Sequence, residues 1–490
     1  MAGIKSLFRD TAIYGVSSIV GRFINWCLVP MYTYCFTDAE YGVVTHIYAY
    51  VALVLTILTY GMETGFFRFA NHDRWQNPGQ VYTTTLTSIG VSSVLFIIAG
   101  CLLSADIAEW LECGAHPSFI WMMVIAVGVD AYTSIPFAYL RYRKRPVRFA
   151  TLKLINISLN IGLNLFFILL CPVIWQKAPQ WIEWFYDPSF GIGYIFMANL
   201  ISSLTVLLLL VPEIVAEGYS FSPRLLKEML RYSFPLLVLG IAGIMNQTID
   251  KILYPMLIPD KAEAMAGLGV YSANYKIAIV MVMFIQAFRF AYEPFIFAQN
   301  RQRDNAKGYA AAMNWFVILS LLMFLGVMYF LPVLKYFVSP KYFAGLRVVP
   351  IIMLAELFFG IFFNLSVWYK ITDRTIWGTW FSLIGLAVTL ALNIIFVPRF
   401  GYMACAWAAF CCYGVMMLAS YLVGRRKYPI GYDIRRILLY FAAAMALWGA
   451  AYLVTTGNNL IDFPTRILLM AVYCGIVYLA EFRHSHPRTA

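Results

Sequence analysis

The sequence predicts an all-α polytopic membrane protein with about fourteen transmembrane helices. Of its 490 residues, 62% are hydrophobic and 12% charged, and the mean hydropathy is +0.74. A soluble domain carries about 25% charged residues, so this chain is not built to face water. Its apolar runs also reach the roughly 20 residues that a helix needs to cross a bilayer. Fourteen such runs are found, at about 11–36, 41–67, 80–104, 118–140, 149–171, 191–212, 234–258, 267–295, 310–334, 345–369, 376–397, 402–424, 436–456 and 464–481.

The distribution of positive charge predicts the orientation of these spans. The formal net charge is +12, but Lys and Arg alternate between successive connections instead of forming a nucleic-acid-binding patch. Of the 36 Lys and Arg residues, 26 fall on one side, 7 on the other and 3 inside predicted spans. Positive charge marks the cytoplasmic side of a membrane protein. We therefore expect both termini to be cytoplasmic, which agrees with an even number of spans, and we expect no nucleic-acid partner.

The first span contains a charged residue, and a proline whose surrounding pattern recurs later in the chain. Arg22 falls near the middle of this span, where a charged side chain costs about 2.5–3.5 kcal/mol on insertion scales. Pro30 interrupts the helical hydrogen-bond ladder near its far end. The pattern Ile-x-x-x-Leu-x-Pro-Met at 24–31 returns at 249–256, in the seventh span. A polar, proline-broken helix that occurs twice at matching places points to a transport site.

Two further echoes in the same order indicate that spans one to six repeat as spans seven to twelve. The second and eighth spans open on Tyr41-Gly42-Val43 and Leu268-Gly269-Val270. Asn164-Leu165-Phe166-Phe167 in the fifth span returns as Asn393-Ile394-Ile395-Phe396 in the eleventh, each followed by a Phe-Gly that opens the next span. An even number of spans per repeat makes the two halves parallel.

The repeat divides the chain into three parts. Residues 1–220 form an N-terminal six-helix bundle, and residues 428–490 add two C-terminal transmembrane helices. Residues 221–427 comprise an interfacial helix and the C-terminal six-helix bundle. Ser222 at the N-cap and Pro223 at the first helical position predict where the interfacial helix begins, and its amphipathic face predicts that it lies in the cytoplasmic interface.

Ionisable residues well inside the spans are the candidate functional residues, because lipid exposure of a charge is too costly. We expect the basic members, together with Asn25 one turn from Arg22, to bind substrate: Arg22, Asn25, Lys251 and Lys276. Converging Arg and Lys side chains in a partly dry cavity suit a phosphate. For the acidic members, ion coupling and structural pairing are both open: Asp130, Asp250 and Glu356.

No motif predicts an enzyme, a metal site or a cofactor. The nine Cys are scattered, mostly within apolar segments, and the five His form no ligand cluster. No phosphate-binding loop and no nucleophile–base spacing is found. The longest external connection, 172–190, holds Trp175, Trp181 and Trp184. Tryptophan is typical of membrane interfaces, and it also suits sugar faces.

The chain resembles the oligosaccharide-lipid flippases of bacterial surface-polysaccharide export, which belong to the multidrug/oligosaccharidyl-lipid/polysaccharide exporter superfamily. The resemblance covers nearly the whole chain. It rests on Gly21-Arg22, Tyr41-Gly42, the run Tyr60-Gly61-Met62-Glu63-Thr64-Gly65-Phe66-Phe67-Arg68 and Tyr232-Ser233-Phe234-Pro235. It implies two six-helix bundles in a V around a central cavity, and alternating access that carries an undecaprenyl-pyrophosphate-linked glycan across the bacterial cytoplasmic membrane.

The resemblance leaves other cargoes open. A multidrug antiporter of the same superfamily would share the fold, but its usual cargo is cationic and three basic residues in the cavity disfavour it. A lipid II flippase would also carry two extra C-terminal helices, but it places several more Arg on the first two spans. A membrane-embedded glycan polymerase or acyltransferase would need reactive groups on external loops, which are short here. Expected partners are the lipid-linked glycan, membrane lipids, a polysaccharide polymerase and assembly proteins.

Overall fold

The structure is a computed structural model that describes residues 20–21, 23–71, 77–111, 113, 116–299, 306–372, 374–454 and 459–485. Within these ranges all regular structure is helical. Twelve helical segments among the described residues are long and apolar enough to cross a membrane, and Gly193–Leu209 is a shorter apolar helix. These thirteen match the second to the fourteenth predicted spans. Of the first predicted span, residues 11–19 and 22 lie outside the described residues. The prediction of an all-α polytopic membrane fold is confirmed.

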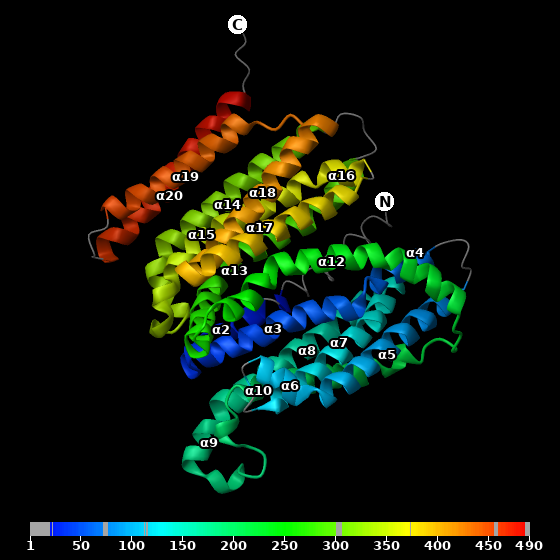
Figure 1. The fold of residues 1–490 in the computed structure, drawn as a ribbon. Coiled ribbons are helices and arrows are strands. Elements are labelled where there is room, and N and C mark those ends of the chain that lie inside the picture. The colour runs from blue at the N-terminus through cyan, green and yellow to red at the C-terminus, as the bar shows by residue number, and fades with distance from the viewer. Residues whose placement is uncertain are drawn as a thin grey trace. The chain divides into compact units, whose positions relative to one another are not determined.

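By their contacts the residues divide into two compact units, Met1–Gly269 and Val270–Ala490. The helices of the first unit, coloured blue to green in Figure 1, are α2 (Leu28–Cys35), α3 (Asp38–Thr59), α4 (Met62–Ala70), α5 (Pro78–Leu102), α6 (Ser104–Trp110), α7 (Pro117–Tyr142), α8 (Pro146–Leu165), a π-helical turn (Phe166–Leu170), α9 (Cys171–Lys177), two 3₁₀ turns (Pro179–Trp181 and Pro188–Phe190), α10 (Gly193–Leu209), α11 (Val211–Ile214), α12 (Pro223–Leu257) and the start of α13 (Lys261–Gln299).

The second unit continues α13 and ends at the C-terminus. Its further helices are α14 (Ala306–Leu334), two 3₁₀ segments (Lys335–Phe337 and Pro340–Arg347), α15 (Val348–Leu365), α16 (Val367–Ile371), α17 (Ile376–Phe400), α18 (Tyr402–Lys427), α19 (Ile434–Val454) and α20 (Asn459–Ser485). The predicted boundary at residue 220 follows the sequence repeat, whereas the boundary at Gly269 follows packing. The predicted domain bounds therefore stay a prediction.

One helix forms the centre of each unit. In the first unit, 67% of the residues in an apolar 18-residue stretch of α7 are buried. Helices α3, α5 and α10 pack around α7. In the second unit, 67% of the residues in an apolar 18-residue stretch of the span Pro340–Ile371, which contains α15, are buried. Helices α14 and α18 pack on α15. Helices α7 and α15 are the fourth and tenth predicted spans. Their spacing of six spans is the spacing of the predicted repeat.

Single residues at echoed positions also adopt the same local structure in both halves. Asn164 and Asn393 are fully buried. The side-chain amide of Asn164 donates to the carbonyl of Asn160, at 2.7 Å, and that of Asn393 to the carbonyl of Thr389, at 2.9 Å. The glycines that follow the two Phe residues, Gly191 and Gly401, both have positive φ, at 47° and 58°. A side chain would strain the backbone there, so glycine is required at both turns.

The segment predicted to form an interfacial helix begins where expected but does not end before the membrane span. The Ser222 side chain accepts a hydrogen bond from the Leu225 N–H at 3.3 Å, as an N-cap residue does. From Pro223 the helix runs unbroken through Pro235 to Leu257. The segment is therefore not a separate helix but the first turns of α12, and its position in the cytoplasmic interface stays a prediction.

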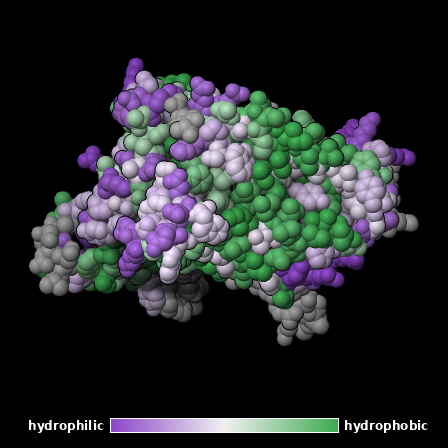
Figure 2. Space-filling view, turned by 90° about the horizontal axis from the view of Figure 1, so that it is seen from below, coloured by the Kyte–Doolittle hydropathy of each residue, from purple (hydrophilic) through white to green (hydrophobic). Residues whose placement is uncertain are grey.

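The surface has the distribution of a membrane protein. Figure 2 shows a face on which hydrophobic residues gather in a broad area between hydrophilic margins. Along α5, the side chains of Val91, Leu95, Ile98 and Leu102 are 52–79% exposed. Exposed apolar side chains at this spacing line one face of a helix, which fits contact with lipid.

The long connection after α8 is ordered around an aromatic core. The rings of Phe167, Tyr186 and Tyr194 stack, and Trp175 packs on Tyr186. Burial raises the pKa of Tyr186 to about 12. Trp181 and Trp184 are instead 72% and 81% exposed. An interfacial anchor and a sugar-binding side chain both have to be exposed, so the exposure of Trp181 and Trp184 is compatible with both roles.

Candidate functional site

Two of the sequence-predicted residues lie on α12 and contact each other. The Lys251 Nζ is 3.4 Å from an Asp250 carboxylate oxygen and donates to the Gln247 carbonyl oxygen at 3.0 Å. The backbone N–H of Lys251 donates to the same Asp250 oxygen at 2.9 Å. The two side chains are 13% and 9% exposed. Asn246, one turn earlier, is also buried. The C-terminal third of α12 thus carries a polar stripe with a paired ammonium group.

The residues predicted to lie beside Arg22 are only partly described. Arg22 itself lies outside the described residues. Asn25 is exposed and falls in the helical residues 23–26 that precede a turn at Cys27. Pro30 lies within α2, and Pro255 lies in the last turn of α12. The role of Arg22 and Asn25 in substrate binding stays a sequence prediction.

Lys276 and Glu356 belong to the second unit. Glu356 on α15 is 4% exposed and accepts a hydrogen bond from the Tyr275 hydroxyl at 2.7 Å. Lys276, the next residue along α13, is half-buried. The structure therefore brings Glu356 to α13 and Asp250 to Lys251. The predicted convergence of Lys251 and Lys276 concerns two different units and stays a prediction.

Asp130 has partners that the sequence analysis did not assign to it. It lies half-buried on α7, hydrogen-bonds with the Ser203 hydroxyl of α10 and interacts electrostatically with Lys153 of α8. The Lys153 Nζ lies 4.0 Å from the centre of the Phe137 ring and also interacts with Glu63. An ammonium group over an aromatic face is stabilised by the ring quadrupole.

A pattern in the sequence could have identified Lys153 as an interior residue. Lys153, Asn156, Asn160 and Asn164 recur at helical spacing along α8, so they share one face. At the far end of this stripe the Tyr32 hydroxyl donates to the Asn164 side-chain oxygen at 3.0 Å. The stripe therefore faces other helices of the first unit rather than lipid. From its place beside the basic cluster 141–148, Lys153 is instead expected in the charged cytoplasmic connection.

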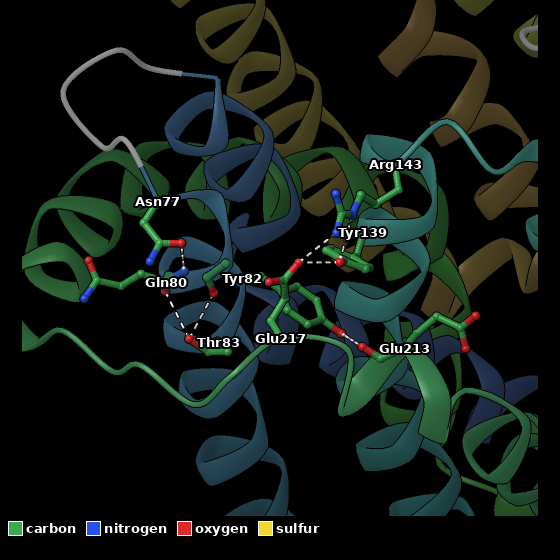
Figure 3. A network of polar contacts seen from close by, with 9 residues as sticks. Asn77, Gln80, Tyr82, Thr83, Tyr139, Arg143, Glu213 and Glu217 are labelled. Carbon is green, nitrogen blue, oxygen red and sulfur yellow. Dashed lines mark hydrogen bonds and ion pairs between the residues drawn. The ribbon is translucent and has the colours of Figure 1, made fainter.

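A second polar network holds the segment 210–222 that joins α10 to α12 (Figure 3). Its described contacts join carboxylates and carbonyls of this segment to α5, α7 and α8. The Arg148 Nε donates to Glu213 at 3.1 Å, Arg143 pairs with Glu217 at 3.2 Å, the Tyr82 hydroxyl donates to the Glu213 carbonyl oxygen at 2.8 Å, and the Thr83 hydroxyl donates to the Ser220 carbonyl oxygen at 2.8 Å. Much of the basic cluster 141–148 thus has a structural role.

The described residues contain no cluster of three or more His, Cys, Asp or Glu side chains able to hold a metal ion. The arrangement can instead offer charged and hydrogen-bonding groups inside apolar helices, chiefly Lys251 with Asp250, and Asp130 with Lys153. Such groups suit the passage or binding of a polar cargo.

Comparisons with solved structures match the fold of this chain. Solved structures of similar fold include "Lipid II flippase MurJ, inward closed conformation", with a TM-score of 0.73 and 14% identity over 96% of this chain and 99% of that one. Another is "a multidrug resistance MATE family transporter of the MOP superfamily" in an inward-facing conformation, with a TM-score of 0.66 and 13% identity over 83% and 94% of the two chains. These identities show the shared fold alone. No curated protein sequence matches.

The family comparison is more specific. Residues 7–298 match the family described as "Polysaccharide biosynthesis protein". The match spans more than half of the 490 residues, and it includes the predicted repeat from the first span into the eighth. The chain therefore belongs to the polysaccharide biosynthesis protein family, and its fold is similar to the folds of a lipid II flippase and a multidrug transporter.

Proposed function

We propose that this protein is a flippase that moves an undecaprenyl-pyrophosphate-linked oligosaccharide across the bacterial cytoplasmic membrane. The oligosaccharide would be a unit of O-antigen, capsule or another surface polysaccharide. The family match supports a step in polysaccharide biosynthesis, and the multi-pass fold supports transport rather than catalysis. A polymerase and assembly proteins on the external side would then consume the product.

The observation that carries the proposal is the largely buried Lys251 ammonium group, which lies beside Asp250 within two turns of the C-terminal end of α12. A half-buried ammonium group in an apolar helix costs free energy and is retained where it serves a site. Its contact with Asp250 is a local one, between neighbouring residues of one helix. A pyrophosphate has more charge and more acceptor oxygens than one carboxylate, so it can compete for the Lys251 Nζ. Cargo binding would then release Asp250 and couple cargo to the charge state of α12.

We disfavour the alternative of a cationic-drug antiporter, because the predicted cavity residues Arg22, Lys251 and Lys276 would repel a cationic cargo. A lipid II flippase would differ from the proposed function only in the headgroup of its cargo, since lipid II also carries a pyrophosphate. In both alternatives the fold is the same, so cargo must be measured directly.

The test in cells compares charge-removing variants with a matched control. Lys251→Gln should lower surface glycan strongly with normal protein abundance, whereas Lys251→Arg should retain part of it. Lys177→Gln removes an exposed charge at the end of α9, and it should leave export unchanged. At Arg22, export should fall in the order Lys, Ala, Glu, because Lys keeps the charge but loses the bidentate fork. Full export by well-expressed Lys251→Gln and Arg22→Ala would refute the phosphate-binding role.

The proposed orientation has its own test. Both termini and the connection around residue 145 should be cytoplasmic, and the connection at residue 38 external, because of the asymmetry of positive charge. In intact cells, a cysteine at position 38 should react with a membrane-impermeant reagent and one at position 145 should not. The reverse pattern would invert the topology.

A further inference from the structure

Glycine contacts occur at both ends of the continuous segment α3–α4, and both are made with helices of the second sequence repeat. At one end Gly42 meets the start of α13. A Cβ added to Gly42 would lie 1.9 Å from the Met265 carbonyl oxygen, and one added to Gly269 would lie 1.9 Å from the Asp38 carbonyl oxygen. The contact is reciprocal, because each glycine meets the backbone of the other helix. Gly42 and Gly269 are also the corresponding residues of the second and eighth spans.

The other end of the segment meets α12 in the same way. Gly61, with φ of +71°, would place a Cβ 3.0 Å from the Leu236 Cβ and 3.2 Å from the Ser233 carbonyl oxygen. A Cβ at Gly65 would lie 2.8 Å from the Ser233 hydroxyl oxygen. Beside this contact the ring of Phe69 packs against that of Tyr232 at 6.1 Å. The spacing of Gly61 and Gly65 therefore serves close helix packing here.

We propose that these two glycine contacts are the closing surfaces of two gates, one on each side of the membrane, and that each opens while the other stays closed. The proposal rests on the alternating access of the proposed function. The Gly42 end is the predicted external gate and the Gly65 end the predicted cytoplasmic gate. Backbone surfaces without side chains suit a contact that forms and breaks repeatedly, because no side chain has to leave a packed position or lose rotamer freedom.

The neighbours of the two glycines predict how strongly a substitution acts. At Gly42 the obstacle is the Met265 backbone, which cannot move without shifting α13. A methyl group is enough to hold this contact apart. At Gly65 the obstacle is the Ser233 hydroxyl, which can rotate away from a methyl group. A larger side chain such as valine is needed there. Overpacking by a methyl group should lower the ratio of closed to open gate roughly 5- to 150-fold.

Two engineered cysteine pairs report the state of each gate in the full-length protein. Ala39 on α3 and Ala262 on α13 line the same pocket of about 420 Å³ beside the Gly42 contact, so Ala39→Cys with Ala262→Cys should cross-link through a short bis-maleimide when that gate is closed. Phe69→Cys with Tyr232→Cys reports the Gly65 end. Single-cysteine variants control for native thiols, because Cys113 also lines the pocket.

The two substitutions should act with opposite sign. Gly42→Ala should lower cross-linking of the 39–262 pair and preserve or raise that of the 69–232 pair. Gly65→Val should do the reverse, with Gly65→Ala weaker than Gly65→Val. Gly243→Ala is the matched control, since a Cβ at this helical glycine of α12 meets nothing within 4 Å, and it should change neither pair.

A loss of both pairs together in either variant would show a packing defect and overturn the proposal, as would unchanged 39–262 cross-linking in Gly42→Ala. Cross-linking does not depend on the identity of the cargo. Opposite shifts in a protein that moves no lipid-linked oligosaccharide would uphold the gates and refute the proposed function.

Discussion

Removing Arg148 should destabilise the first unit far more than removing Arg143, although both residues pair with a carboxylate of the segment 210–222. The Arg148 Nε donates to Glu213 at 3.1 Å, and its Nη2 donates to the Leu209 carbonyl oxygen at 2.8 Å. The Glu213 side chain is 7% exposed and that of Arg148 is 41% exposed. Arg148→Met therefore leaves a buried carboxylate without its guanidinium partner.

The magnitude follows from two contributions. A hydrogen bond to a charged group is worth about 1.5–3 kcal/mol. Stranding one member of a buried pair costs about 3–5 kcal/mol in all, and the exposure of Arg148 places this pair at the lower end. We therefore expect a loss of about 3 kcal/mol. With roughly 2–4 °C per kcal/mol for units of 150–250 residues, the melting temperature should fall by roughly 6–12 °C.

The assay is thermal unfolding of the detergent-solubilised protein, with Arg143→Met as the control. Arg143 and Glu217 are 53% and 26% exposed, and exposed ion pairs contribute about 1 kcal/mol or less. Combining Arg148→Met with Glu213→Gln removes the stranded charge and should recover most of the lost stability. Equal shifts for the two arginines, or a double variant no better than Arg148→Met alone, would refute the reasoning.

The remaining predictions concern the interior acidic residues. Lys153→Met should lower protein abundance by leaving the half-buried Asp130 carboxylate uncompensated, and adding Asp130→Asn should restore abundance. If export then stays low, Asp130 couples ions, and if it returns, the pair is structural; unchanged abundance in Lys153→Met contradicts the pairing. Tyr275→Phe should cost about 1.5–3 kcal/mol, because it removes a 2.7 Å hydrogen bond to the buried Glu356. An unshifted melting curve for Tyr275→Phe would contradict this.

Much of the fold could be predicted from the sequence because membrane spans and repeats leave strong local signals. Long apolar runs marked the second to fourteenth spans close to their observed bounds. The echo of Gly42 and Gly269 predicted a repeat, and their reciprocal contact shows why glycine stands at both positions. Two backbones this close leave no room for a side chain, so the contact requires glycine. A glycine repeated at matching positions can be recognised in the sequence.

Partner choice for interior charges was harder to predict. Lys153 lies only two turns into α8, and a lysine near a helix end usually extends toward the interface. In the structure its ammonium group instead lies over Phe137 and interacts with Asp130. The continuity of α12 was also not apparent, because Pro235 after an amphipathic segment is typical of a helix boundary. Both outcomes depend on tertiary packing, which local patterns do not encode.

The most direct test of the central claim is translocation of a purified lipid-linked oligosaccharide in proteoliposomes. The protein is reconstituted into vesicles that contain a fluorescent undecaprenyl-pyrophosphate oligosaccharide, and the fraction accessible to an impermeant glycosidase is followed in time. We expect the wild-type protein to make the inner-leaflet pool accessible, Lys251→Gln to do so slowly, and Lys177→Gln to match the wild type. Equal rates for wild-type and Lys251→Gln protein, or no translocation of this lipid alongside rapid translocation of lipid II or a cationic dye, would contradict the central claim.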